Sequence, residues 1–106
     1  MLFPGEATAD GIVRVGPLHF MTRSPVRAGT IRAAIRPEAW ALGPAGIEGL
    51  PGVVSKHAYL GSYQELTVAT EIGDIFVVTA QTDESWSVGA ALTLSLHDRG
   101  VSVVAA

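Results

Sequence analysis

The feature that most constrains the fold is an apolar–polar alternation with a period of two, repeated in several short segments. In LTLSL (92–96) three leucines alternate with Thr and Ser, and IRAAI (31–35) and ELTVAT (65–70) alternate in the same way. Successive side chains of an extended chain point to opposite faces, so this pattern predicts strands with one buried face. DIFVVTA (74–80) is β-branched and apolar on both faces, which predicts a central strand.

Turn signals separate these segments at the spacing of about 8–12 residues that is typical of barrels and sandwiches. Gly16-Pro17, for example, lies between GIVRV (11–15) and LHFM (18–21). The helical pattern is limited to PEAWAL (37–42), where Pro37 can take the first position of one turn. The chain is therefore predicted to be an all-β barrel or sandwich with at most one short helical turn.

GPAGIEGLPG (43–52) has glycine at every third position and predicts a linker between two halves. A weak internal repeat spans this segment. A shift of 61 residues places the apolar positions of 31–35 on the leucines of 92–96, and both sets are expected to point into the barrel. We expect a single domain, which the length of 106 residues also favours. This domain is expected to span 1–106, with a first half at 10–42, the linker at 43–52 and a second half at 53–104.

Composition and local motifs exclude several functions. The absence of cysteine excludes disulfides and thiolate metal sites. The chain has no phosphate-binding G-x-x-x-x-G-K-[ST] loop and no G-x-S-x-G elbow, so no enzymatic activity is predicted. His19, His57 and His97 lack the helical spacing of a metal pair, and Asp83 and Glu84 have the pattern of solvated turn residues. No apolar run approaches the roughly 20 residues of a membrane-spanning helix, and the first residues do not resemble a signal peptide.

Charge is unevenly distributed along the chain. Residues 1–36 carry five arginines and two acids, a net charge of +3, whereas residues 37–106 carry two cations and eight acids, a net charge of −6. The basic third fits either an anionic partner or a solvated strand face. A single-stranded nucleic-acid barrel would need a basic groove with stacking aromatics. Here the seven aromatic residues are scattered and the net charge is −3.

Three longer segments together resemble one family. They are GTIRAAIRPEAW (29–40), GLPGVVSKHAYLGSYQELTVATEIGDIFVV (49–78) and WSVGAALTLSLHDRGVSVV (86–104). The I-R-P-E tetrapeptide, the Y-L-G turn and the closing glycine-led strand are similar to the TOBE-containing C-terminal region of ABC importer ATP-binding subunits. That group serves sugars, polyamines, ferric iron and other small solutes. The S-A-R-N-type segment of the molybdate-binding relatives is absent.

The resemblance implies an OB-like small β-barrel built from two half-repeats, with a non-catalytic regulatory and dimerisation role in solute transport. Its implied partners are the ATPase domain of the same subunit, the dimer mate and, indirectly, the membrane permease; a homodimer is also possible and nucleic acid is not expected. No cofactor is expected in this chain, because ATP and Mg²⁺ would belong to the ATPase domain. The implied location is cytoplasmic, peripheral to the inner membrane through the transporter. The alternatives are a stand-alone module for an oxyanion or the transported solute, and a single-stranded nucleic-acid barrel.

Candidate interface residues come from two places in the sequence. Pro37 lacks a backbone donor and restricts the preceding residue to extended geometry, so strand pairing is expected to end after Ile35. Two opposite charges would then leave the sheet beside it, either toward a partner or toward groups within the barrel. The other group is the Y-L-G turn. The predicted interface residues are Arg36, Glu38, Tyr59, Leu60 and Gly61.

Overall fold

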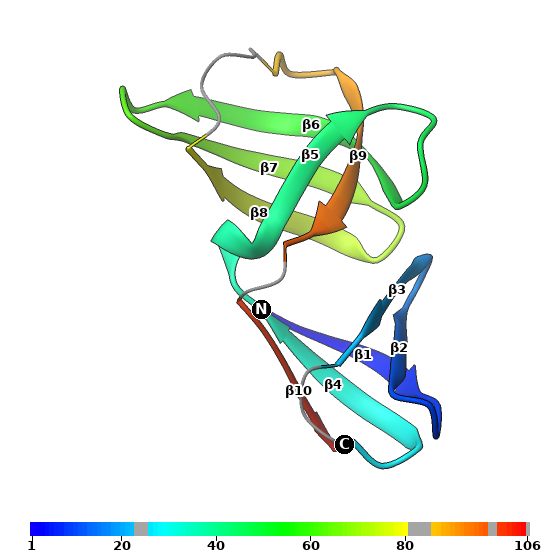
Figure 1. The fold of residues 1–106 in the computed structure, drawn as a ribbon. Coiled ribbons are helices and arrows are strands. Elements are labelled where there is room, and N and C mark those ends of the chain that lie inside the picture. The colour runs from blue at the N-terminus through cyan, green and yellow to red at the C-terminus, as the bar shows by residue number, and fades with distance from the viewer. Residues whose placement is uncertain (23–25, 81–85, 98–99, 106) are drawn as a thin grey trace.

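The computed structural model describes residues 1–22, 26–80, 86–97 and 100–105. These residues form two five-stranded antiparallel sheets and one 3₁₀ turn, η1 (Pro37–Ala39), in agreement with the predicted all-β class (Figure 1). Sheet A has the strand order β10-β4-β1-β2-β3 and sheet B the order β5-β9-β6-β7-β8. The strands are β1 (Leu2–Ala7), β2 (Ile12–Val15), β3 (Leu18–Met21), β4 (Gly29–Ile35), β5 (Trp40–Pro44), β6 (Leu50–Tyr59), β7 (Gln64–Thr70), β8 (Gly73–Thr79), β9 (Ala91–Leu96) and β10 (Val101–Ala105).

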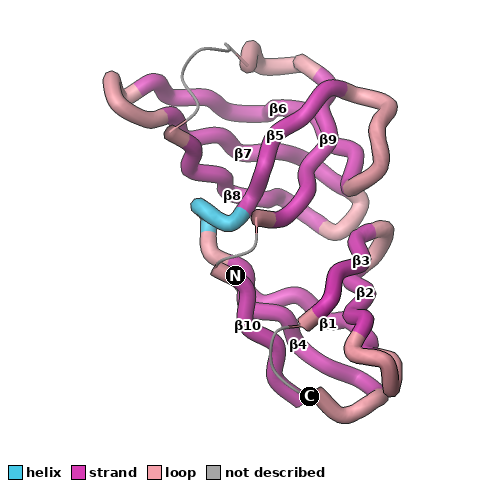
Figure 2. The backbone as a smooth tube through the Cα atoms, in the orientation of Figure 1, coloured by secondary structure: helices cyan, strands magenta, loops and turns pink. Residues whose placement is uncertain are grey.

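The two sheets curl separately and lie end to end, which gives an elongated molecule of 41 × 24 × 20 Å (Figure 2). The N-terminus lies at the junction between the sheets, and the C-terminal end lies at the far end of sheet A. The chain crosses the junction twice, once from β4 to β5 and once from β9 to β10. The junction is therefore formed by segments that are far apart in the sequence.

Each sheet takes one strand from the other half of the chain. β5 follows β4 but pairs with β9, and β10 follows β9 but pairs with β4. Ile35 faces Val101 in one pair and Leu96 faces Trp40 in the other, so the shift of 61 residues maps one register onto the other. The backbone bonds at the junction repeat in the same way: the Arg36 N–H donates to Gly100 at 2.9 Å, and the His97 N–H donates to Ala39 at 2.7 Å. The predicted half-repeat is confirmed.

β1 and β6 are also counterparts, and the sequence analysis missed this. Each pairs with the repeated strand of its sheet, which aligns Phe3-Pro4-Gly5 with Leu50-Pro51-Gly52. Both glycines lie where the neighbouring strand comes close. A Cβ on Gly5 would meet the carbonyl oxygen of Arg14, and a Cβ on Gly52 would meet the side chain of Val68. Glycine is therefore required at both places by close packing.

Two local expectations differ from the structure. Residues 43–52, predicted as a linker, are strand at both ends: Gly43 and Pro44 end β5, and Leu50–Gly52 begin β6. The glycine spacing instead serves the turn between these strands, where Gly46 and Gly49 have φ values of +90° and +141°. β8, predicted as a central strand, is at the end of the order in sheet B, and its outer face carries Asp74 and Phe76. The apolar residues on both faces of β8 therefore do not indicate a central strand with both faces buried.

The hydrophobic core is continuous across the junction. The rings of Phe3 in β1 and Trp40 in β5 meet edge to face, with centroids 6.1 Å apart. Leu92 and Leu94 are buried as expected, while Leu96 is half-buried at the end of β9. The largest fully buried side chains come from both sheets: Trp40, Ile31, Ile35, Leu50, Leu66, Ile75, Leu92, Leu94, Gln64, Val13, Val15 and Val54.

Candidate functional site

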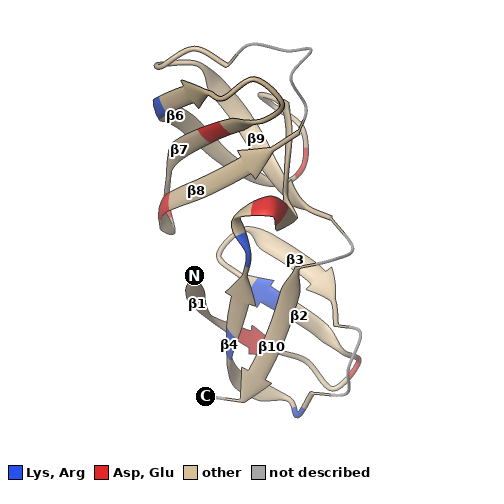
Figure 3. Cartoon of the chain, turned by 90° about the vertical axis from the view of Figure 1, so that its left-hand side faces the viewer, with Lys and Arg blue, Asp and Glu red and all other residues tan. Residues whose placement is uncertain are grey.

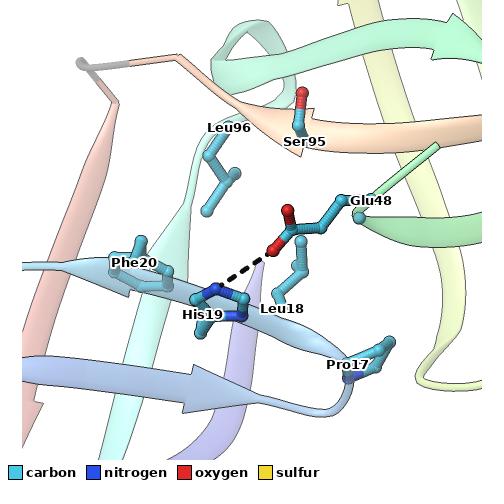
Figure 4. A pocket seen from close by; sticks show the side chains of 8 residues that line it. Pro17, Leu18, His19, Phe20, Glu48, Ser95 and Leu96 are labelled. Atoms are coloured by element: carbon cyan, nitrogen blue, oxygen red, sulfur yellow. Dashed lines mark ion pairs between the residues drawn. The ribbon is translucent and has the colours of Figure 1, made fainter.

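A cleft between the two sheets is the site that combines charged side chains with apolar walls (Figure 4). Its volume is about 230 Å³. Sheet A contributes the β2–β3 turn and β3, and sheet B contributes the segment before β6 and the end of β9. The lining residues are Pro17, Leu18, His19, Phe20, Glu48, Gly49, Ser95 and Leu96.

An ion pair crosses this cleft. His19 Nε2 in β3 lies 3.3 Å from Glu48 Oε1, which precedes β6, so the contact joins one sheet to the other (Figure 4). The β2–β3 turn is held against sheet B, since Gly16 lies directly against the side chain of Ile72 in the β7–β8 turn. The side chains of His19 and Glu48 are 57% and 82% exposed. An exposed pair of this kind contributes about 0–1 kcal/mol, so its chemistry matters more than its effect on folding.

The cleft offers an imidazole and a carboxylate above apolar walls formed by Leu18, Phe20 and Leu96. The Ser95 side chain points away from the His19–Glu48 contact in Figure 4. A carboxylate repels an anion, so the cleft suits a small neutral or cationic group better than an oxyanion. Among the described residues there is no group of three or more His, Cys, Asp or Glu side chains that could hold a metal ion.

The predicted interface residues fall in two separate places. Arg36 and Glu38 are exposed beside η1 at the junction, whereas Tyr59, Leu60 and Gly61 are exposed at the tip of the β6–β7 hairpin (Figures 1 and 2). Arg36 has the extended geometry expected before a proline, with φ −75° and ψ 150°, and β4 ends at Ile35. The structure thus gives both groups exposed positions but does not bring them together. Their role at an interface stays a prediction.

The other singled-out polar residues do not form a second site. His57 hydrogen-bonds to the side chain of Gln64 near the tip of the β6–β7 hairpin, and His97 is exposed after β9. Asp83 and Glu84 lie outside the described residues.

Charge is unevenly divided between the two sheets (Figure 3), and the exposed aromatic side chains are unevenly divided as well. In the described part of the chain, the basic residues of sheet A and the segments joined to it are Arg14, Arg27, Arg32 and Arg36, against Glu6 and Asp10. From η1 through sheet B, the described residues include one cation, Lys56, and five acids. The exposed aromatic side chains, Tyr59, Tyr63 and Phe76, all belong to the acidic part. A single-stranded nucleic-acid groove needs both properties on one surface, and this arrangement separates them.

None of the helical structure in the described ranges is long and apolar enough to cross a membrane.

Comparison with known proteins gives three concordant results. The family model described as "TOBE domain" matches residues 33–104. An Fe(3+) ions import ATP-binding protein, FbpC, from Agrobacterium fabrum is 35% identical over 96 residues, which are 90% of this chain and 27% of the relative. FbpC from Rhizobium etli is 29% identical over 101 residues, 94% of this chain and 29% of the relative. The chain thus spans less than a third of the length of these relatives.

The cytoplasmic molybdate-binding protein ModG, solved with molybdate bound, has a similar structure. Its TM-score is 0.73 at 15% sequence identity, and the match covers 100% of this chain and 96% of that one. At this identity the similarity shows the OB-like fold alone. Because the family match covers most of the residues from β4 to β10, the chain belongs to the TOBE domain family.

Proposed function

We propose that this chain is the non-catalytic regulatory region of an ABC importer ATP-binding subunit. The observation that carries the proposal is the pair of matches to iron importer ATP-binding proteins, which extend over at least 90% of this chain but less than a third of theirs. The remaining part of such a subunit would bind ATP and Mg²⁺ and hydrolyse the nucleotide. The chain itself has none of the phosphate-binding motifs that this chemistry requires.

Regulation would act through contacts with the ATPase domain of the same subunit and with its dimer mate. The exposed pair Arg36 and Glu38 at the junction and the hairpin tip Tyr59-Leu60-Gly61 are the predicted contact points. Exposed apolar and aromatic side chains such as Tyr59 and Leu60 are typical of surfaces that another protein covers. The subunit would lie on the cytoplasmic side of the inner membrane, held there by the permease.

A domain exchange tests this function. The matching region of the Agrobacterium fabrum relative is deleted in one variant and replaced by this chain in another, and ATP hydrolysis and iron uptake are compared with the parent. We expect the deletion to change the ratio of ATP hydrolysed to iron imported, and the replacement to restore it. Catalysis in the isolated chain, or a deletion that changes neither rate, would contradict a regulatory role.

The cleft supports a second candidate function, a small-ligand module that senses the transported solute. The specific observation is the exposed His19–Glu48 pair above apolar walls at the boundary between two sheets. A ligand that binds only the native state raises the melting temperature. At a hundredfold excess over Kd it adds about 2.7 kcal/mol to the free energy of unfolding. The test is a thermal-shift screen of small cations, neutral sugars and molybdate. A shift that Glu48→Gln abolishes would place the ligand in the cleft, and no shift with any compound would exclude this candidate.

A further inference from the structure

The two sheets differ in how one equivalent area of their outer faces is covered. In sheet B, Thr93 lies between the inward-facing Leu92 and Leu94, so its side chain points outward, yet it is only 2% exposed. The β5–β6 segment lies over it. A Cβ on Gly49 would be 2.7 Å from Cγ2 of Thr93, and a Cβ on Gly43 would be 2.8 Å from Cδ1 of Ile47. Sheet B therefore covers this area with its own chain.

The corresponding area of sheet A is uncovered. The shift of 61 residues maps Thr93 onto Arg32, and Arg32 lies between Val104 and Pro4 just as Thr93 lies between Gly43 and Pro51. Arg32 and Pro4 are exposed. We call the area formed by Leu2, Pro4, Arg32, Ala34 and Val104 the Arg32 face. Leu2 is 62% exposed, Val104 is 53% exposed, and a hollow of about 300 Å³ lies among Leu2, Phe3, Pro4 and Arg32.

The Arg32 face joins a cation to an apolar surround. The side chains on either side of Arg32 across the strands, Val104 and Pro4, carry no charge. Glu6 and Thr30 lie on the same outer face, two residues further along β1 and β4, and Glu6 is opposite Arg14. Among the described residues no ion pair joins Arg32 to a carboxylate. A guanidinium within exposed apolar surface complements a partner that supplies a carboxylate together with apolar side chains.

We propose that the Arg32 face is the docking surface for the remaining part of the importer ATP-binding subunit. The docked element is a short apolar segment carrying a carboxylate. This inference rests on the proposed function, because the curated relatives have more than two thirds of their length outside this chain. Sheet B shows the apolar part of such an element: Ala45–Gly49 leads into β6 and covers the equivalent area with Ile47 and Gly49, while Glu48 reaches His19 in the cleft. β1, the counterpart of β6, contributes Leu2 and Pro4 to the Arg32 face.

This chain contains no cysteine, so an introduced cysteine is the one maleimide site within it, and labelling is followed at that position by peptide mass. A single cysteine is introduced as Val104→Cys, and its rate of reaction with a maleimide is measured in the isolated chain and in the Agrobacterium fabrum fusion described above. The matched control is Val88→Cys, at a position that is 65% exposed and far in sequence from the Arg32 face. We expect the fusion to slow labelling of Cys at 104 at least tenfold and to leave the control unchanged.

A charge change tests the role of the guanidinium. Arg32→Glu in the fusion is expected to return labelling at position 104 to within about twofold of the isolated chain, while Arg32→Lys keeps most of the protection. Lys56→Glu, at an exposed cation on β6 of sheet B, is the control and should keep full protection. Circular dichroism of each variant verifies that the sheets remain folded.

Two results would overturn the proposal. Equal labelling in the isolated chain and the fusion would show that the subunit leaves the Arg32 face open. Protection in the isolated chain that grows with its concentration would show that a second copy covers the face instead. If the fusion restores coupled ATP hydrolysis while position 104 stays reactive, the proposed function stands and only the docking surface is wrong.

Discussion

The two sheets repeat one strand order but use strands of different length. β1, β2 and β3 of sheet A have 6, 4 and 4 residues, whereas their counterparts β6, β7 and β8 have 10, 7 and 7. In sheet B, η1 and β5 lie against β8, so the two ends of the strand order approach one another. The longer strands also carry the hairpin tip with Tyr59 and Tyr63 beyond the core. Equal topology therefore does not imply equal closure or equal surfaces.

The outer faces of the two sheets differ because one sheet has a chain segment that covers its outer face and the other, in the part of the chain that the structure describes, has none. Sheet B covers its outer face at Thr93 with the β5–β6 segment, whereas sheet A leaves Arg32 and its apolar neighbours exposed. A repeated fold can thus present a finished surface in one half and an open surface in the other. The exchange of β5 and β10 links the two halves, because each sheet takes one strand from the other half of the chain.

The largest expected effect comes from breaking the packing that joins the sheets. Trp40→Ala removes a fully buried side chain of sheet B that contacts Phe3 of sheet A. The expected loss is about 3–5 kcal/mol of unfolding free energy. Urea unfolding followed by circular dichroism measures it, with Tyr59→Ala on the exposed hairpin as a control that costs little. Hydrogen exchange should speed up in both sheets; acceleration limited to sheet B would show that the two are independent.

A smaller effect compares the two equivalent glycines. Gly5→Ala places a methyl group against the backbone carbonyl of Arg14, which cannot move without disturbing β2. Gly52→Ala first meets a methyl group of the buried Val68 side chain, and the Ala69 carbonyl oxygen lies 3.2 Å away. Overpacking costs about 1–3 kcal/mol, and we expect Gly5→Ala to be the more costly of the two. Thermal melts of both variants check the order, and a reversed order would mean that β1 adapts more readily than β6.

The smallest effect is expected at the contact across the cleft. Glu48→Gln removes the charge that pairs with His19, and both side chains are more than half exposed. The predicted change in unfolding free energy is below about 1 kcal/mol and should vanish in 1 M salt. Denaturant titration at low and high salt measures it. A larger, salt-independent loss would indicate that the pair holds the sheets together, contrary to its exposure.

Several elements of the fold could be predicted because their signals are local. The alternation at 31–35, 65–70 and 92–96 gave β4, β7 and β9, and Pro37 marked the end of β4. The shift of 61 residues already contained the register that the structure confirms. These inferences succeed because the two faces of a strand and the backbone of a proline depend on residues near in sequence.

The strands β1 and β6 were missed for a physical reason. Proline and glycine at Phe3-Pro4-Gly5 and Leu50-Pro51-Gly52 normally argue against a strand. β1 pairs with β2 only from Glu6 onward, and β6 pairs with β7 only from Gly52 onward. Pro4 and Pro51 therefore lie where their strand has a neighbour on one side only. The missing donor is tolerated there. The sequence pattern alone does not show where pairing with β2 or with β7 begins.

The sequence predicted the exposed interface residues, but the cleft and the Arg32 face depend on tertiary contacts. Arg36, Glu38 and the Y-L-G turn are exposed, as the local turn signals suggested. The His19–Glu48 cleft and the Arg32 face had no local signal, because each brings together strands that are separated by more than twenty residues.

The sequence by itself determined that this chain is all-β, that its halves repeat, and which face of each repeated strand is buried. Only the tertiary structure decided that β5 and β10 are exchanged between sheets, that both ends of 43–52 are strand, and which outer face is left open. The reason is that a period of two specifies the two faces of a strand but not its neighbours. Neighbours are selected by packing across the whole chain.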